Sequence, residues 1–201
     1  IFTASYYTCL PSNIQIGDIF KAVQNIQDTE TIIETASVSA GAGDFDEAVR
    51  LLEKHVLPGT ESLLQSGDDG VAAVFRAAGL FRMMHRFTDA RSLYARILEI
   101  REHPEVYNCL GYISQREGQF TRALEFHRRA VEMNPDNSGL RSNYAKALME
   151  TGDGRQGIDQ LRCAVRESPG NMKVHSNLLF SLHHMSQLDR EMLFEEHRKW
   201  A

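Results

Sequence analysis

Apolar residues recur at intervals of three and four along most of this chain, which is the spacing of one face of an α-helix. The clearest case is residues 104–137, where two apolar helical stretches are separated by a glycine and followed by a proline. Residues 138–171 have the same length of 34 residues and the same order of apolar, glycine and proline positions. This period predicts consecutive pairs of antiparallel helices.

The small and helix-breaking residues of the two segments fall at matching positions. Gly118 aligns with Gly152, and Pro135 aligns with Pro169. We expect the glycines to form the turn inside each pair, because glycine adopts a positive φ at no steric cost. The prolines end the second helix, because proline has no amide hydrogen to donate. The small Gly111 is expected to let the two helices of its pair approach closely.

This pattern resembles the tetratricopeptide repeat family. The resemblance is carried by Tyr107, Leu110, Gly111, Gly118, Phe120, Ala123, Ala130 and Pro135. It implies an all-α fold in which helix-turn-helix units stack into a right-handed superhelix with a concave groove. An all-helical bundle is the alternative, although a bundle does not need a 34-residue recurrence.

The same register extends in both directions and predicts the organisation of the chain. We expect an N-terminal arm and capping helix over residues 1–28, repeats over 29–62, 71–103, 104–137 and 138–171, and a partial repeat with a C-terminal capping or linker helix over 172–201. A capping helix is expected because a terminal repeat has one open face to cover. Residues 63–70 are an insertion, predicted to lengthen the preceding second helix and then form a loop.

The end of the chain departs from the repeat pattern. "HSNLLFSLHH", residues 175–184, fits a further first helix, but "LFEEHRKWA", residues 193–201, has no glycine turn or small residue at the repeat spacing. These two stretches resemble the junction in protein O-glycosyltransferases of the O-GlcNAc transferase and SPINDLY type. There the last repeat runs into a helical linker ahead of the catalytic region. The resemblance implies a substrate-recognition region whose catalytic part is absent from these 201 residues. A freestanding adaptor or assembly scaffold that ends in a capping helix is the alternative.

The chain itself carries no pattern typical of an enzyme, so we predict neither catalytic activity nor a cofactor. No strand is followed by a glycine-rich turn that could hold a nucleotide diphosphate. No motif arranges Ser, His and Asp as a catalytic triad. His183 and His184 are adjacent and therefore lie on different sides of a helix, and no HExxH motif is present, so no metal site is expected.

The candidate binding residues follow from the register, because first helices line the inner surface of such an array. They are Asn108, Tyr112, Gln115 and Arg116 in one repeat, Asn143, Lys146 and Glu150 in the next, and Asn177, Phe180 and His184 in the last. A protein or an extended peptide is the predicted partner of this surface.

Two of these residues, Asn143 and Asn177, are 34 positions apart and offer the same chemistry. A carboxamide has a donor and an acceptor, so it can hold a peptide backbone without reading the side chains. The resemblance to O-GlcNAc transferases implies such an asparagine ladder. Earlier repeats depart from it, with Cys109, Arg76 and Glu34 at this position. The alternative is that these amides bond within the array.

A competing mode is the carboxylate clamp of chaperone-binding tetratricopeptide domains, in which basic side chains hold a terminal carboxylate. Asn143 and Lys173 match two of its positions, whereas Asn108, Tyr112 and Asn177 depart from it.

Composition narrows the partners further. The chain has 27 acidic and 22 basic residues, a net charge of -5, which argues against a nucleic-acid surface. No apolar run approaches the roughly 18 residues of a membrane helix. The three cysteines are far apart and favour neither a disulfide framework nor a zinc site, so a cytoplasmic location is expected. Self-association stays open, through the last helix or the convex side.

Overall fold

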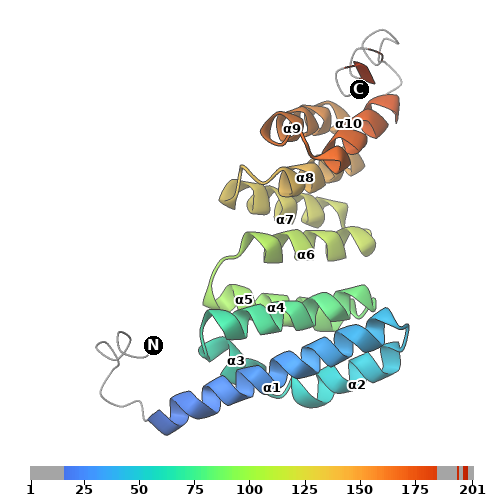
Figure 1. Cartoon of the computed structure of the whole chain (residues 1–201). Coiled ribbons are helices and arrows are strands. Elements are labelled where there is room, and N and C mark those ends of the chain that lie inside the picture. The colour runs from blue at the N-terminus through green and yellow to red at the C-terminus, as the bar shows by residue number, and fades with distance from the viewer. Residues whose placement is uncertain (1–15, 185–193, 195–196, 199–201) are drawn as a thin grey trace. The chain divides into compact units, whose positions relative to one another are not determined.

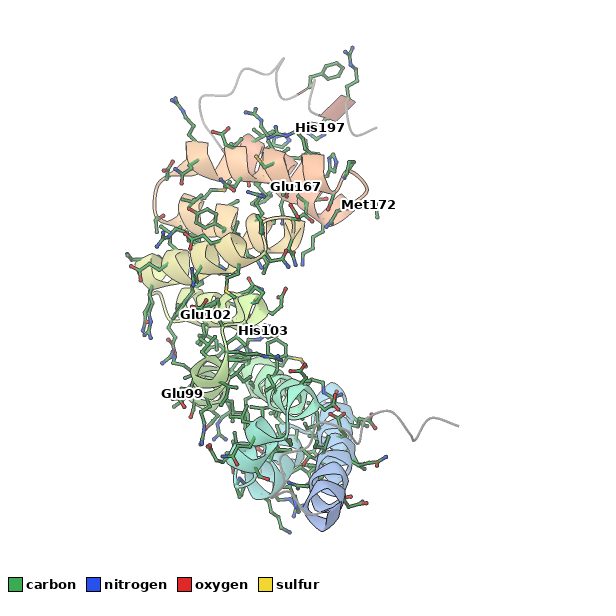
Figure 2. All side chains as sticks on the ribbon, turned by 90° about the vertical axis from the view of Figure 1, so that its left-hand side faces the viewer. Glu99, Glu102, His103, Glu167, Met172 and His197 are labelled. Atoms are coloured by element: carbon green, nitrogen blue, oxygen red, sulfur yellow. The ribbon has the colours of Figure 1, made fainter. Side chains whose placement is uncertain are left out.

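The structure is a computed structural model of the chain. It describes the backbone of residues 16–184, 194, 197 and 198, and the side chains from residue 24 to residue 183 and at the three later positions. All regular elements in these described residues are helices, which confirms the predicted all-α fold class (Figure 1). The chain divides into two compact units between Ile100 and Arg101, in the segment marked by Glu99, Glu102 and His103 in Figure 2.

The first unit is built from three long helices, one shorter helix and one very short one. They are α1 (Ile16–Gly41), α2 (Phe45–His55), α3 (Thr60–Gln65), α4 (Asp68–Met83) and α5 (Phe87–Ile100). α1 packs against α2 and α4, and α4 packs against α5. The buried side chains between them include Leu52, Phe81 and Tyr94. These helices form two antiparallel pairs whose first members, α1 and α4, lie against each other.

Two features of the first unit differ from the expected boundaries. The expected division at residue 28, between a capping helix and the first repeat, falls inside α1. Residues 18–40 contain neither glycine nor proline, so no residue there interrupts the helix. In the insertion, α2 is not lengthened. It ends at His55, three residues before Pro58, and the chain then forms the separate helix α3, which packs on α4.

In its described residues, the second unit is a series of five helices that pack in chain order. It contains α6 (Pro104–Arg116), α7 (Phe120–Met133), α8 (Ser138–Glu150), α9 (Gly154–Glu167) and α10 (Met172–His184). Each of these helices packs against the next one in the chain, and the first helices α6, α8 and α10 also contact one another in order. A core of Ala145, Ile158, Leu161, Leu178 and Leu182 joins α8, α9 and α10.

The turns inside the helix pairs share one backbone conformation. Gly43, Gly118 and Gly152 have φ values of 86°, 75° and 96° at the turns that follow α1, α6 and α8. His85 stands at the corresponding turn between α4 and α5, with φ of 61°. The left-handed region costs a residue with a Cβ about 1–2 kcal/mol, so this turn is strained where the other three are not.

Close approach of the helices in a pair depends on glycine, as the sequence predicted for Gly111. A Cβ placed on Gly111 would lie 2.7 Å from the ring of His127 on α7. A Cβ on Gly157 of α9 would lie 2.8 Å from the backbone oxygen of Ala145 on α8. Neither distance leaves room for a methyl group, so the α6–α7 and α8–α9 spacings require these glycines.

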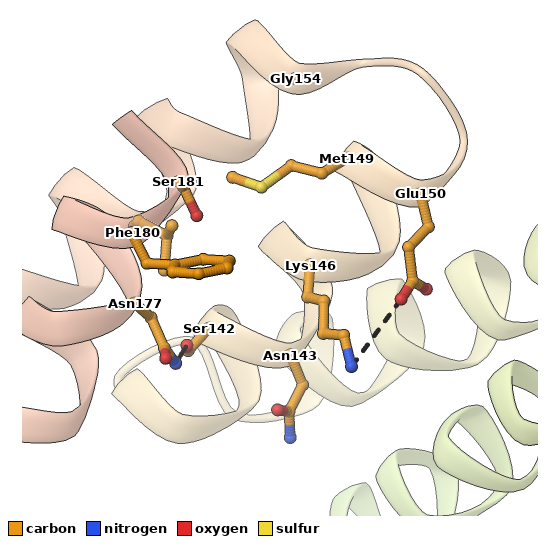
Figure 3. Close-up of a pocket in the computed structure, with 10 residues that line it drawn as sticks. Ser142, Asn143, Lys146, Met149, Glu150, Gly154, Asn177, Phe180 and Ser181 are labelled. Atoms are coloured by element: carbon orange, nitrogen blue, oxygen red, sulfur yellow. Dashed lines mark hydrogen bonds and ion pairs between the residues drawn. The ribbon is translucent and has the colours of Figure 1, made fainter. Parts of the chain in front are cut away.

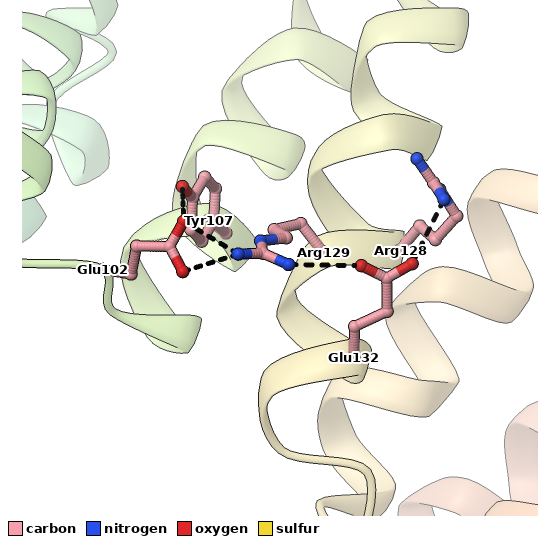
Figure 4. A network of polar contacts seen from close by, with 5 residues as sticks. All are labelled: Glu102, Tyr107, Arg128, Arg129 and Glu132. Carbon is pink, nitrogen blue, oxygen red and sulfur yellow. Dashed lines mark hydrogen bonds and ion pairs between the residues drawn. The ribbon is translucent and has the colours of Figure 1, made fainter.

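Charged side chains on the outer surface connect successive helices. The guanidinium of Arg129 on α7 lies between the carboxylates of Glu102, which precedes α6, and Glu132 (Figure 4). Its bond to Glu102 is 2.6 Å long and lowers the pKa of that carboxyl below its ordinary value. All three side chains are exposed, so solvent screening keeps their contribution to stability small.

Arg141 of α8 makes a better protected set of contacts. It pairs with Glu167 at the end of α9 at 2.9 Å, and donates to Gln160 and to the backbone oxygen of Pro135. The side chain of Arg141 is only 15% exposed. This residue therefore fixes α8 against both α9 and the preceding turn.

Candidate peptide-binding groove

A cavity of about 630 Å³ lies on the first-helix surface of the second unit, between α8, the start of α9 and α10 (Figure 3). We call it the α8/α10 groove. It is lined by Ser142, Asn143, Lys146, Met149, Glu150, Gly154, Leu161, Asn177, Phe180 and Ser181. A volume of this size is within the range of sites that hold small ligands or side chains.

One wall of the groove is apolar. Phe180 on α10 is 67% exposed. The side chains of Phe180 and Met149 extend from α10 and α8 into the same space (Figure 3). Leu161 of α9 is buried and contributes the apolar surface beneath them. The wall therefore offers apolar contact area from three helices.

The opposite side carries a pair of opposite charges. Lys146 and Glu150, four residues apart on α8, approach to 3.7 Å between Nζ and Oε1 (Figure 3). The second carboxylate oxygen of Glu150 accepts a hydrogen bond of 2.6 Å from the Nε2 amide of Gln115 on α6. Both oxygens of Glu150 are thus engaged, and its charge is balanced by Lys146.

Gln115 is in turn held by a buried histidine. The Nε2 atom of His127 lies 3.2 Å from Oε1 of Gln115, and because this oxygen can only accept, Nε2 carries the hydrogen. His127 is 1% exposed, and its Nδ1 atom has no hydrogen-bond partner. Burial, with a smaller contribution from the positive charge of Lys146, lowers the pKa of His127 from 6.5 to about 4. The ring is therefore neutral near pH 7.

The asparagines of the surface connect consecutive first helices. Asn143 Nδ2 donates to Oδ1 of Asn108 on α6 at 2.8 Å. Asn177 Nδ2 donates to the hydroxyl of Ser142 on α8 at 2.9 Å, which is the same pairing one repeat later. Each amide thus uses one N–H of its NH2 group within the array. Among the described residues, the carbonyl oxygens of Asn143 and Asn177 have no hydrogen-bond partner, and both asparagines are exposed.

The structure brings five of the candidate residues together. Asn143, Lys146, Glu150, Asn177 and Phe180 all line the α8/α10 groove. Asn108 and Gln115 lie outside the groove but bond to residues that line it. Tyr112 and Arg116 are exposed on α6 and do not line the groove. The side chain of His184 lies outside the described residues.

Other residues of the groove had not been identified from the sequence. They are Ser142, Met149, Gly154, Leu161 and Ser181, together with His127 behind Gln115. Ser142 had a usable signal, because it is 34 positions after Asn108 and takes the same place on its helix. Met149 and Leu161 had none, since their apolar side chains fit the core pattern equally well.

The first unit has a smaller hollow of about 290 Å³ between its own first helices, α1 and α4. Glu34 and Arg76, which stand at the position of Asn143, both line it. Arg76 forms an ion pair with Glu30. Charged side chains therefore take the place that carboxamides have in the second unit.

Three other kinds of feature bear on function: a metal site, the cysteine thiols and a membrane-spanning helix. In the described part of the chain, no group of three His, Cys, Asp or Glu residues could hold a metal ion. Cys109 and Cys163 are free thiols. Over the described helices, none combines the length and the apolar character needed to span a bilayer.

Residues 115–176 match the family model of the tetratricopeptide repeat, and this segment includes α7, α8, α9 and the start of α10. The chain contains tetratricopeptide repeats. The repeat fold extends well beyond that segment. The crystal structure of YrrB, a TPR protein with an unusual peptide-binding site, is 18% identical with a TM-score of 0.57, over 90% of each chain. At this identity the likeness shows the fold alone.

Two further proteins are similar to parts of this chain. An O-GlcNAc transferase mutant from Thermobaculum terrenum is 23% identical with a TM-score of 0.59, over 65% of this chain and 25% of that one. The inactive TPR repeat-containing thioredoxin TTL3 of Arabidopsis thaliana is 32% identical over 83 residues, which are 41% of this chain and 12% of that protein. The tetratricopeptide chain thus spans a small part of the length of each.

Proposed function

We propose that this chain is a protein-interaction module that binds an extended peptide segment along α6, α8 and α10, with the α8/α10 groove as its centre. The observation that carries the proposal is the pair of carbonyl oxygens on Asn143 and Asn177, which have no partner among the described residues and lie beside an open cavity. An extended backbone has N–H groups that need such acceptors.

The hydrogen bonds refine the predicted asparagine ladder. One N–H of each NH2 group is already used between helices, so each amide offers a peptide its carbonyl oxygen as an acceptor, beside one remaining N–H. The peptide N–H groups are the matching chemistry. The carboxylate clamp is less well supported, because Lys146 is the one basic residue among the described ones that line the groove, and it is paired with Glu150.

The narrower role that we propose is substrate recognition for a protein O-glycosyltransferase of the O-GlcNAc transferase and SPINDLY type. The support is the sequence of residues 175–184 and 193–201, together with the fold similarity to the Thermobaculum terrenum enzyme. The repeats would present acceptor proteins to a catalytic region outside these residues. A cytoplasmic location, and a peptide rather than a nucleic acid as partner, belong to the same proposal.

A freestanding adaptor or assembly scaffold is the second candidate, and the structural similarity to YrrB over 90% of both chains fits it. The mass of the native gene product separates the two roles. A mass well above 22.8 kDa, with room for a catalytic region, supports the glycosyltransferase role. A mass near this value supports the adaptor.

Peptide binding itself is tested by selecting a randomised dodecapeptide display library on the chain and measuring the affinity of enriched peptides by fluorescence polarisation. The double substitution Asn143→Ala and Asn177→Ala should weaken binding by about 1–3 kcal/mol, or roughly 5- to 150-fold, because two acceptors are lost. Asn134→Ala is the matched control, since Asn134 is an exposed asparagine at the end of α7. Equal affinities for the two variants would contradict the proposed role.

A further inference from the structure

The apolar wall of the α8/α10 groove is not explained by backbone recognition alone. Carboxamide oxygens are sufficient to hold peptide N–H groups, and they require no apolar contact. Yet Phe180 exposes 67% of its surface on α10, and Met149 of α8 extends that apolar surface above the buried Leu161. An apolar surface that borders a cavity can be covered by an apolar group of a ligand.

The charges in the groove indicate that the covering group is uncharged. Lys146 and Glu150 neutralise each other, and the second carboxylate oxygen of Glu150 is occupied by Gln115. A charged side chain entering the groove would lose its hydration and find no uncompensated opposite charge. A neutral, apolar side chain loses no such hydration and gains contact with Phe180 and Met149.

The hydrogen-bonding groups at the rim indicate the backbone conformation of the occupant. Because Asn143 and Asn177 use one N–H each between helices, their carbonyl oxygens can accept from N–H donors of a ligand. In an α-helical ligand, or in a helix of a second copy of this chain, the backbone N–H groups are already bonded to carbonyls of the same helix. An extended segment has its N–H groups available, and its successive side chains point in opposite directions. It can therefore donate to the rim and place one side chain in the cavity.

We propose that the α8/α10 groove is an anchor pocket for one large apolar residue of an extended peptide, such as Phe, Tyr, Trp, Leu, Ile or Met, seated against Phe180 and Met149. This inference rests on the proposed peptide-binding function and adds a side-chain preference to it. A backbone held by amides would bind many sequences with similar affinity. The pocket selects those that present a large apolar residue at one fixed position.

The size of the preference follows from the area that the anchor buries. Burying a large apolar side chain changes the affinity by about 10- to 100-fold relative to alanine at that position. The same factor should be lost when the pocket loses its aromatic wall. The two losses should not add, because each removes the same contact.

The experiment uses the same randomised dodecapeptide library, displayed on phage and selected against the whole chain. Enriched peptides are measured by fluorescence polarisation against the chain, Phe180→Ser, Phe120→Ser and the double asparagine variant. Phe120→Ser is the matched control, because Phe120 is 44% exposed at the start of α7 and does not line the groove. Each peptide is also made with alanine at its most strongly enriched apolar position.

The expected result is a shared large apolar position, a loss of about 10- to 100-fold with Phe180→Ser, and little change with Phe120→Ser. The alanine peptide should be equally weak on the chain and on Phe180→Ser. If peptides bind and depend on the asparagines but not on Phe180, the anchor pocket is refuted while the proposed function stands. If no peptide is enriched, both fail.

The same set of proteins distinguishes two other occupants of the groove, a helical ligand and a second copy of this chain. Proline substituted along the enriched peptides abolishes binding of a helical ligand but is tolerated at several positions of an extended one. Light scattering after size-exclusion chromatography shows whether Phe180→Ser dissociates a dimer. Helical ligands, or a dimer that depends on Phe180, would overturn the proposal of an extended peptide.

Discussion

Replacing His127 by glutamine should change how the stability of the chain depends on pH. His127 is 1% exposed, and its pKa is lowered from 6.5 to about 4, chiefly by burial. The folded state therefore keeps the ring neutral over a range in which the unfolded state binds a proton. As the pH falls from about 6.5 to 4, the unfolded state gains protons relative to the folded state, and the free energy of unfolding decreases.

The size of this effect follows from the two pKa values. Each pKa unit corresponds to about 1.4 kcal/mol, so the whole transition removes about 3 kcal/mol, of which about 2 kcal/mol is already lost at pH 5. Above pH 7, none of this free energy of unfolding is lost. Glutamine does not titrate, and it retains an amide N–H that can donate to Gln115. The difference in pH dependence of the free energy of unfolding between the unsubstituted chain and His127→Gln is thus the contribution of His127 alone.

The assay is urea denaturation followed by far-UV circular dichroism at pH 7 and pH 5. Between these two pH values, the free energy of unfolding of the unsubstituted chain should fall by about 2 kcal/mol more than that of His127→Gln. His55→Gln, at an exposed histidine that ends α2, is the control and should follow the unsubstituted chain. Parallel losses in the chain and in His127→Gln would refute the reasoning, because they would mean that the buried ring takes up its proton as readily as the unfolded chain does.

Two further predictions concern the glycines and the strained turn. Gly157→Ala should destabilise the chain by about 1–2 kcal/mol, because the new methyl meets a backbone oxygen of α8 at 2.8 Å, and this cost exceeds the helix propensity that alanine adds. Gly79→Ala in α4 meets only a side-chain oxygen at 4.0 Å and should stabilise by about 0.5–1 kcal/mol in the same urea titration. His85→Gly should stabilise by about 1 kcal/mol, less what is lost with the edge-on contact to Phe87, by relieving the positive φ of 61°. Gly118→Ala at the equivalent turn should have the opposite sign, and two changes of the same sign would show that these turns tolerate a Cβ.

The helix pairs of the second unit were predictable because one small residue determines each spacing. The small Gly111 predicted that α6 and α7 approach closely. The side chain that faces it across this contact is His127. The position of Gln115 on the first-helix surface was equally accessible from register. Its bond to Glu150 was not, because that bond joins side chains 35 residues apart and depends on the rotamers of both.

The first unit was less predictable, for a physical reason. A repeat register marks helix ends by glycine and proline, and α1 continues through residue 28 because neither is present there. The register placed Phe180 on the first-helix surface, where it is 67% exposed. It did not place Met149 beside Phe180, because the apolar side chain of Met149 fits the core pattern equally well.

Within the second unit, each helix packs mainly on helices that are one or two places away in the chain. Such an arrangement can extend stepwise when it is pulled, one helix pair at a time. Tension applied to its ends is carried from pair to pair, and a pair can detach without disturbing a distant one. Each detached pair releases about 110 Å of chain and can pack again when the tension falls, because its contacts are all local. The unit can thus lengthen under tension and recover its packing afterwards.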